Sequence, residues 1–379
     1  MPLVLSEEQQ MLQETTKGFA EERSPVSELR RLRDEDVEDG FHRGLWQQMA
    51  ELGLTGVLVP EEHGGAGFGY VGAGLIAQEM GRTLAASPFI ATSLMAATAL
   101  NHLGTDEQKA RHLPKIASGE SVFAIASDEG KKHKPSHIEM KAERSGNGFK
   151  LSGEKTFVAE GYAADQLIVA ARTSGADDNE EGITLFLVDA KAAGVAKERM
   201  KTIDDRGFAR LKLDGVEVDG DAVLGDVDRG MEGLKVILDA GRAGLAAEMV
   251  GASEGAFAMT LDYLKQRKQF GTEIGRFQAL QHRAAHLYTE IELAKAVMHQ
   301  ALDELDQGAD KASASVSLAK AKIGQVARLA TNEAVQMHGG IGMTDEYDVG
   351  FFMKRVRVAN ELFGDQDFHM EKLAEVMGY

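Results

Sequence analysis

The sequence has no cysteine, only six prolines and a single tryptophan. The lack of cysteine excludes disulfides and thiolate metal sites. Few prolines and no long low-complexity run argue against a disordered chain. Basic residues are also scarce, since 42 Lys and Arg stand against 60 Asp and Glu and the formal net charge is -18. This charge disfavours nucleic acid and anionic membranes as partners, because both attract positive charge.

The remaining composition is ordinary for a globular protein of two or three domains, with 379 residues, 43% hydrophobic and 27% charged. The N-terminal residues lack the apolar core of a signal peptide. The most apolar stretches are interrupted by charge within less than a membrane span. No spacing of His, Asp or Glu is typical of a metal site. We therefore expect a cytoplasmic protein without a metal.

Apolar residues recur at helical spacing among charged ones through most of residues 6–120. From about residue 121 the pattern changes to short apolar or alternating segments, bounded by turns such as Gly146-Asn147-Gly148. Helical patterns return after Gly230 and continue to Tyr379. The sequence predicts an α+β protein with three domains: a helical domain over 1–120, a β-domain over 121–229 and a helical bundle over 230–379.

Several motifs placed on this α–β–α order resemble those of the acyl-CoA dehydrogenase family. Tyr263–Gly271, followed by Phe277-Gln278, is similar to the family's Arg-x-x-Phe-Gly…Gln signature, and Gln336–Gly342 is similar to its Gln-x-x-Gly-Gly-x-Gly. Further family landmarks are matched by Pro60–Gly67, Gly104–Lys109 and Leu151–Lys155. The resemblance covers essentially the whole chain. It implies the family's fold, with an N-terminal helical domain, a middle β-barrel domain and a C-terminal four-helix bundle.

The resemblance also implies that the chain binds FAD. A guanidinium suits the pyrophosphate because it offers several fixed donors, an aromatic ring can pack on the dinucleotide, and glycines let the backbone approach it. The matching residues are Arg267, Phe270, Gln278, Gln336, Gly339 and Gly340. In the family these motifs reach the FAD of a neighbouring subunit, so the resemblance implies an oligomer, either a dimer or a tetramer.

The catalytic base of the family is absent from both positions that could supply it. The family removes a proton from the carbon beside a thioester, and a hydride passes from the β carbon to the flavin. The base is a glutamate whose pKa is raised by a dry pocket. Phe363, before Gly364, occupies the first position, and Gly241, before Arg242, occupies the second. Neither side chain can accept a proton.

The loop Ser127–Lys134 matches the family loop that holds flavin and thioester, with substitutions. Ser127 keeps a hydroxyl, and Phe157 keeps the aromatic face expected beside the flavin. His133 replaces a serine and, together with Arg242, is a candidate substrate-binding residue. The run Lys131–Lys134 is either a contact for the phosphates of CoA or a solvated loop.

Three acidic residues are candidate replacements for the missing base. Asp365 and Glu361 flank the first position, and Asp239 lies two residues before Gly241. The alternative interpretation makes Asp365 a turn residue after Gly364 and makes the other two charges on helix surfaces.

Three functions remain open. The first is an FAD-dependent acyl-CoA dehydrogenase that desaturates an acyl-CoA between its α and β carbons and passes electrons to an electron-transfer flavoprotein. The second is a non-catalytic small subunit that contributes FAD-contacting residues to a heteromeric dehydrogenase. Leu362–Asp365 and Ile274–Ala285 resemble such subunits, including that of pimeloyl-CoA dehydrogenase. A flavin monooxygenase of the same fold would also lack the glutamate, but no specific feature supports it.

Overall fold

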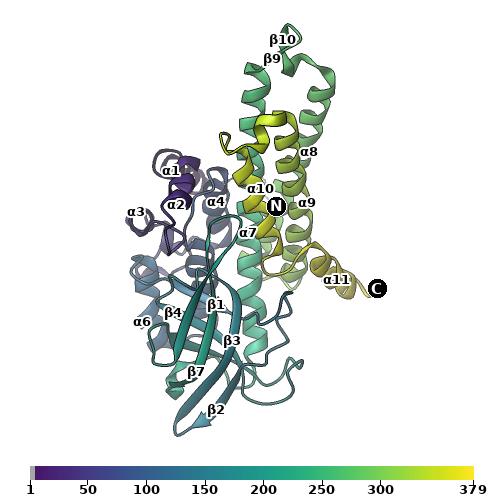
Figure 1. Cartoon of the computed structure of the whole chain (residues 1–379). Helices are drawn as coiled ribbons and strands as arrows, with labels where there is room; N and C mark the ends of the chain where they lie inside the picture. Colours follow the sequence, from purple (N-terminus) through teal and green to yellow (C-terminus); the bar gives the residue numbers. More distant parts are fainter. Residues whose placement is uncertain (1–4) are drawn as a thin grey trace. The chain divides into compact units, whose positions relative to one another are not determined.

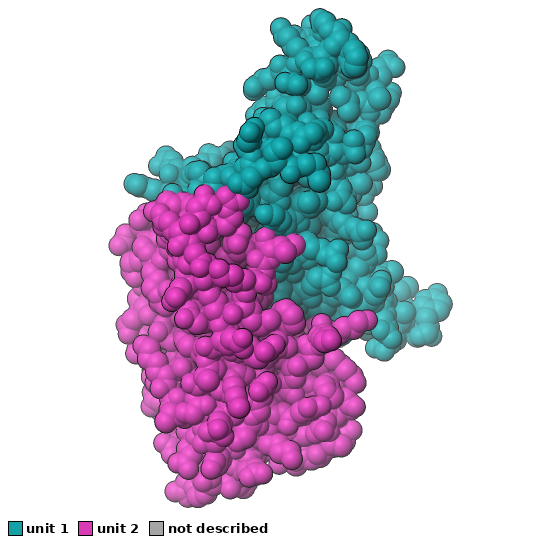
Figure 2. All heavy atoms as spheres, viewed as in Figure 1, with its two compact units in different colours: residues 1–30, 70–85, 242–379 teal, residues 31–69, 86–241 magenta. Residues whose placement is uncertain are grey.

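The computed structural model describes residues 5–379, which form two compact units (Figure 2). Unit 1 joins the chain up to residue 30, residues 70–85 and residues 242–379. Unit 2 joins residues 31–69 and 86–241. Both units therefore contain segments that are distant in sequence. The division into domains over 1–120, 121–229 and 230–379 stays a prediction, because the compact units follow spatial packing rather than chain order.

Unit 1 is helical, and its long helices lie side by side in the cartoon (Figure 1). Helix α9 packs against α8, α10 and α11. The elements of this unit are α1 (Glu7–Arg23), α4 (Gly69–Arg82), most of α7 (Gly230–Gln266), β9 (Lys268–Gln269), β10 (Thr272–Glu273), η5 (Ile274–Arg276), α8 (Gln278–Asp306), α9 (Ala312–His338), η6 (Gly339–Met343), α10 (Val349–Glu361) and α11 (Gln366–Met377). The helical bundle predicted after Gly230 is confirmed.

The small residues of α7 permit a close approach of α4. A Cβ atom built on Gly251 would lie 1.8 Å from the carbonyl oxygen of Gln78, and one built on Gly81 would lie 2.1 Å from the carbonyl oxygen of Glu248. Backbone therefore meets backbone at this crossing, as the run of glycine and alanine in the sequence suggests.

A buried ionic network fastens the N-terminal helix α1 to the same pair of helices. The amide of Gln13 donates to Glu79 at 2.8 Å, and the guanidinium of Arg82 contacts both Glu79 and Glu254 at 3.0 and 2.8 Å. Burial raises the pKa of Glu79, although the positive charge of Arg82 opposes this. These contacts explain why α1 and α4 belong to the unit formed by the C-terminal helices.

Unit 2 combines short helices with the β-sheet. The chain enters it within α2 (Val26–Asp34). Its other helical elements are α3 (Arg43–Glu51), η1 (Leu54–Gly56), η2 (Glu61–His63), the π-helix η3 (Ile90–Ala96), α5 (Ala97–Leu103), α6 (Asp106–Ala117) and η4 (Gly220–Ala222). Helix α6 begins directly after Thr105, because Thr105 and Gln108 form a reciprocal capping box.

The β-domain is a sheet of eight strands in the order β6-β7-β3-β2-β4-β5-β8, with β1 paired to β4. The strands are β1 (Phe123–Ala126), β2 (Lys141–Ser145), β3 (Gly148–Ala159), β4 (Gln166–Arg172), β5 (Ile183–Asp189), β6 (Val195–Lys201), β7 (Gly207–Val218) and β8 (Val223–Leu224). Apolar patterns predict β1, β3, β4, β5 and β7. Patterning misses β2 and β6, because both are charged and largely exposed. No pairing joins β6 to β8 among the described strands, so the predicted barrel is open at that seam.

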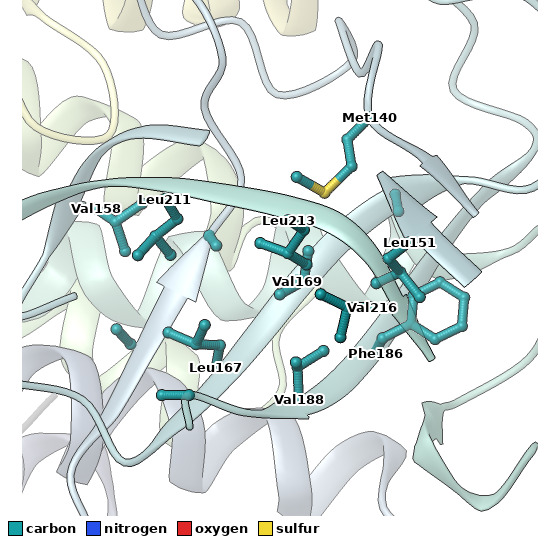
Figure 3. Packing of buried hydrophobic residues seen from close by; sticks show 14 of the residues in the cluster. Met140, Leu151, Val158, Leu167, Val169, Phe186, Val188, Leu211, Leu213 and Val216 are labelled. Carbon is teal, nitrogen blue, oxygen red and sulfur yellow. The ribbon is translucent and has the colours of Figure 1, made fainter. Parts of the chain in front are cut away.

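Inward-facing side chains of these strands form the core of unit 2 (Figure 3). Leu151 from β3, Val169 from β4 and Leu213 from β7 point toward one another in this view. The adjacent loops are held by polar contacts: the guanidinium of Arg172 donates to the carbonyl oxygens of Ile138 and Asp177 at 2.8 and 2.9 Å. Among the helices of residues 5–379, none has the length and apolar character needed to cross a membrane.

We expect Gly251→Ala to lower the free energy of unfolding by about 1–3 kcal/mol, because the methyl group would overlap the carbonyl of Gln78 and force α4 and α7 apart. Gly18→Ala is the matched control, since it lies inside α1 and a Cβ there would meet nothing within 4 Å. The control should be neutral or stabilising by up to about 1 kcal/mol. Urea denaturation of both variants checks this, and equal effects would contradict it.

Candidate functional site

The turn between α10 and α11 carries the first expected base position. Phe363 has a left-handed backbone with φ 56°, which is uncommon for a bulky residue, and its side chain is 7% exposed. The Nε of Arg242 donates to the carbonyl oxygen of Phe363 at 2.9 Å. A buried hydrocarbon ring on an unusual, anchored backbone therefore stands where the resemblance places a glutamate.

Lys320 of α9 holds the same turn from both sides of Phe363. Its Nζ donates to the carbonyl oxygens of Asn360 and Gly364 at 3.0 and 3.1 Å, and the residue is 1% exposed. Burial lowers the pKa of Lys320 to about 7, and the charge of Arg242 acts in the same direction. Two buried basic side chains thus bind three carbonyls, one at the end of α10 and two in the turn that follows it.

The second expected base position leaves no space for a side chain. A Cβ built on Gly241 would lie 2.6 Å from the Sδ of Met95, and Met95 is fully buried. A glutamate could enter this position only if the side chain of Met95 moved. Both positions are therefore filled by apolar atoms.

The three candidate replacement acids differ in their surroundings. Asp365 accepts the backbone N–H of Phe368 at 2.9 Å and caps α11, which confirms its interpretation as a turn residue. Glu361 has an exposed side chain 3.6 Å from Arg357, as expected of a surface charge. The surface interpretation of Asp239 is wrong, because Asp239 is 5% exposed. Helix α7 is covered by other elements along this part of its length, which a small-residue pattern alone does not reveal.

The first FAD motif forms a hairpin at the end of α7. The N–H of Arg267 donates to the carbonyl of Tyr263 at 2.8 Å, and β9 then pairs with β10. Phe270 and Gly271 form the turn, both with positive φ, and Phe270 is 92% exposed. The hairpin projects an aromatic ring into solvent, an arrangement that burial within this chain does not explain. Gln278 follows as the exposed first residue of α8.

The second FAD motif is the end of α9. Gln336 is exposed in the last turn, and the helix stops at His338 because Gly339 takes a φ of 66°. A Cβ on Gly339 or on Gly340 would meet nothing within 4 Å. Their backbone is therefore open to approach by another molecule.

These two motifs fit a dinucleotide. Within residues 5–379 the exposed guanidinium of Arg267 has no carboxylate partner, so its donors are available to phosphate oxygens. The exposed ring of Phe270 and the open backbone of Gly339 and Gly340 supply the apolar and close-contact surfaces that such a ligand needs. Arg267, Phe270, Gln278, Gln336, Gly339 and Gly340 all belong to unit 1.

The predicted flavin-side residues lie in unit 2. Phe157 is 44% exposed and sits at an irregularity of β3 with φ 50°. Ser127 is buried, and its carbonyl accepts the Nζ of Lys155 at 3.1 Å. His133 has a 4% exposed side chain whose Nδ1 lies 2.9 Å from a carboxylate oxygen of Asp128. The roles of these residues and of Arg242 stay predictions.

A buried ion pair near this loop was not evident from the sequence. The Nζ of Lys155 lies 2.6 Å from the carboxylate of Glu129, and both side chains are buried. This ion pair fastens the base of the loop, because Glu129 also accepts the backbone N–H groups of Glu139 and Met140. Burial lowers the pKa of Lys155, and Glu129 opposes that shift. The lysines of the run Lys131–Lys134 are exposed, which fits the solvated-loop interpretation.

Comparisons with known proteins agree with this geometry. Family models described as the N-terminal, middle and C-terminal domains of acyl-CoA dehydrogenase match residues 6–120, 124–216 and 228–378. Probable acyl-CoA dehydrogenase YngJ of Bacillus subtilis is 32% identical over 358 residues, which is 92% of each chain. The chain belongs to the acyl-CoA dehydrogenase family.

Solved structures extend the likeness over the whole fold. Butyryl-CoA dehydrogenase of Megasphaera elsdenii has 25% identity and a TM-score of 0.92, with complete coverage of both chains. A variant of the Tcur3481-Tcur3483 steroid ACAD has 30% identity and a TM-score of 0.88, covering 98% of both chains. The acyl-CoA dehydrogenase fold expected from the motifs is thus confirmed. The family consists of FAD-dependent oxidoreductases that act on CH–CH bonds, and the chain falls in this class.

Lys320 is the residue of this region that sequence reasoning missed. Val316 and Ile323 lie at helical spacing from it and are buried, so Lys320 stands on the apolar face of α9. A lysine on an otherwise apolar helix face is the feature of the sequence that could have identified it. Its partners are carbonyls from α10 and the following turn, and no side-chain pattern in a sequence marks backbone acceptors.

We predict that Lys320 makes stability depend on pH. Burial lowers its pKa to about 7 in the folded protein, from an ordinary value of 10.5. Between pH 7 and pH 10.5 the unfolded state therefore binds more protons at Lys320 than the folded state does. The free energy of unfolding rises with pH through this window for that reason. Relative to Lys320→Met, the wild type should gain stability between pH 7 and pH 9, by up to about 1.4 kcal/mol per pH unit.

The measurement is urea denaturation of both proteins at pH 6, 7, 8 and 9. Lys322→Met is the control, because Lys322 lies on the same helix with a partly exposed side chain paired to Glu290. A stability difference between wild type and Lys320→Met that stays constant over the range would contradict the shifted pKa.

Proposed function

We propose that this chain is the base-lacking subunit of a heteromeric acyl-CoA dehydrogenase, and that it contributes FAD-contacting residues to the assembly. The main support comes from the two positions at which the family places its base. Phe363 occupies the first position, and the side chain of Met95 fills the space beside Gly241 at the second. FAD held in the assembled enzyme would supply the acceptor for the hydride that leaves the β carbon of an acyl-CoA. This chain supplies Arg267 and the Gly339–Gly340 backbone to the dinucleotide, and the partner chain supplies the base.

The length of α7 supports the assembly. Arg242 binds the turn at Phe363, and Gln266 precedes the hairpin of Arg267. With a rise of about 1.5 Å per residue, these two residues of the helix are about 36 Å apart. That distance exceeds what FAD spans between its ring and its pyrophosphate. A flavin beside the turn of one chain therefore cannot reach Arg267 of that same chain, so the motif serves a flavin associated with another subunit.

The relatives agree with a two-chain enzyme. The name of the Tcur3481-Tcur3483 steroid ACAD, which is 30% identical to this chain, joins two designations. A further structural relative at 28% identity, with a TM-score of 0.93, comes from work on the electron transferring flavoprotein of Acidaminococcus fermentans. We take such a flavoprotein as the electron acceptor and the bacterial cytoplasm as the location.

One observation favours a self-sufficient dehydrogenase instead. Asp239 is an acid buried in α7, two residues before the second base position. A buried carboxylate is the kind of group that an enzyme uses as a base. If Asp239 takes this role, the chain alone would desaturate its substrate.

The test is to purify the chain alone, supply FAD and add butyryl-, octanoyl- and pimeloyl-CoA anaerobically. We expect no bleaching of the flavin absorbance by the lone chain. Bleaching should appear when the chain is co-expressed with a family member from the same genome that carries the glutamate. Full bleaching of the lone wild type, abolished in Asp239→Asn, would refute the proposal and identify Asp239 as the base.

FAD binding should depend on Arg267. We expect Arg267→Met to weaken FAD binding about 10- to 100-fold, because a charge-assisted hydrogen bond contributes about 1.5–3 kcal/mol. Arg276→Met is the control: Arg276 is an exposed arginine next to the same hairpin, but it is paired with Glu273 at 3.0 Å and lies outside the motif. Titration of flavin-free protein by FAD fluorescence quenching measures both, and equal affinities would exclude Arg267 as a phosphate ligand.

A further inference from the structure

Three aromatic rings join the two FAD motifs. Tyr263 lies near the end of α7, and His338 is the last residue of α9. Their rings are stacked, with centroids 4.4 Å apart and planes inclined by 27°. The ring of Tyr347, from the loop before α10, contacts both, at 5.6 Å from Tyr263 and 5.0 Å from His338. We call Tyr263, His338 and Tyr347 the aromatic triad.

Each motif contains one ring of this triad, Tyr263 in the first and His338 in the second. The N–H of Arg267 donates to the carbonyl of Tyr263, and the carbonyl of Arg267 accepts the N–H of Ile274 on the far side of the hairpin. On the other helix, His338 precedes Gly339 without an intervening residue. The Nδ1 of His338 lies 2.7 Å from the carbonyl oxygen of Ala334, so this nitrogen carries the proton and the ring orientation is fixed.

Arg30 of α2 holds the loop that carries the third ring, that of Tyr347. The guanidinium of Arg30 donates to Asp345 and Asp348, at 3.0 and 2.6 Å, and these residues stand on both sides of Tyr347. Arg30 also lies over the ring of Phe351 at 4.9 Å. The loop that presents Tyr347 is therefore held by two charge-assisted hydrogen bonds.

The surroundings of the triad suit packing rather than proton transfer. His338 is 3% exposed, and burial lowers its pKa, while the carbonyl of Ala334 opposes the shift. A neutral imidazole packed against two phenol rings contributes offset and edge contacts of modest energy. That energy is small for the whole fold. It acts, however, where side chains of the two motifs contact each other.

We propose that the aromatic triad is a positioning element that sets the spacing between the Arg267–Phe270 hairpin and the Gly339–Gly340 backbone, and so makes both available to one dinucleotide. This inference rests on the proposed role of the two motifs in holding FAD. A ligand that needs both motifs at once loses affinity when their spacing is no longer defined, even though no ligand-contacting residue has changed.

The first test is FAD titration of flavin-free protein by fluorescence quenching. His338→Ala should raise the FAD dissociation constant at least tenfold, and His338→Phe, which keeps a ring in the stack, should stay within threefold of wild type. Leu302→Ala is the control for lost stability, because Leu302 is buried against Gly74 and is remote in sequence from both motifs. It should lower the melting temperature and leave FAD affinity unchanged.

The second test needs no cofactor. In flavin-free protein, hydrogen exchange followed by mass spectrometry should show faster exchange in hairpin residues 267–274 of His338→Ala, although the substitution lies in α9. Leu302→Ala should not change that peptide. If His338→Ala does not fold, Tyr347→Ala offers a variant of the same contact in a half-buried loop position.

Unchanged FAD affinity together with unchanged exchange in the hairpin would overturn the role of the triad. Failure of the wild type itself to bind FAD would instead refute the proposed function. The exchange result would still decide whether the rings couple the two motifs.

Discussion

The structure depends on one long helix whose neighbours approach at backbone distance. Helix α7 has 37 residues, and glycines on it admit α4 so closely that a single added methyl group would overlap a carbonyl oxygen. Because the helix is rigid, it fixes the separation of two sites along its length. Arg242 binds the carbonyl oxygen of Phe363. Tyr263 accepts the backbone N–H of Arg267, where the hairpin with the predicted FAD contacts begins. The turn at Phe363 and the hairpin of Arg267 are therefore far apart along this helix, which is the distance that supports the proposed assembly.

The turn at Phe363 is held by two buried basic side chains. Arg242 and Lys320 bind the carbonyls of residues 360, 363 and 364, and residue 363 has a left-handed backbone. Such a conformation costs about 1 kcal/mol or more and persists only where surrounding contacts impose it. The phenylalanine at residue 363 has no group that can accept a proton, and this is the feature on which the proposed role of the chain depends.

The dinucleotide side of the chain shows the opposite pattern. Its predicted ligand-contacting groups are exposed and open, and they adjoin the buried ring of His338, the half-buried rings of Tyr263 and Tyr347, and the ion pairs of Arg30. The ring of Phe270 is 92% exposed and meets the ring of Phe277 edge-on, so most of its apolar surface faces solvent. This exposure supports the proposed role, in which the chain helps to hold a flavin that another chain uses.

The sequence by itself determined the family, the α–β–α order and the gap at Phe363 and Gly241, because these follow from residue identities at fixed spacing. It also indicated most buried strands, since apolar alternation is local. It missed the charged strands β2 and β6, which are fixed by pairing rather than by burial. It also missed Lys320, the burial of Asp239 and the contact of Tyr263 with His338. Only the tertiary structure decided these, because each depends on partners far along the chain, backbone carbonyls among them, that no local pattern identifies.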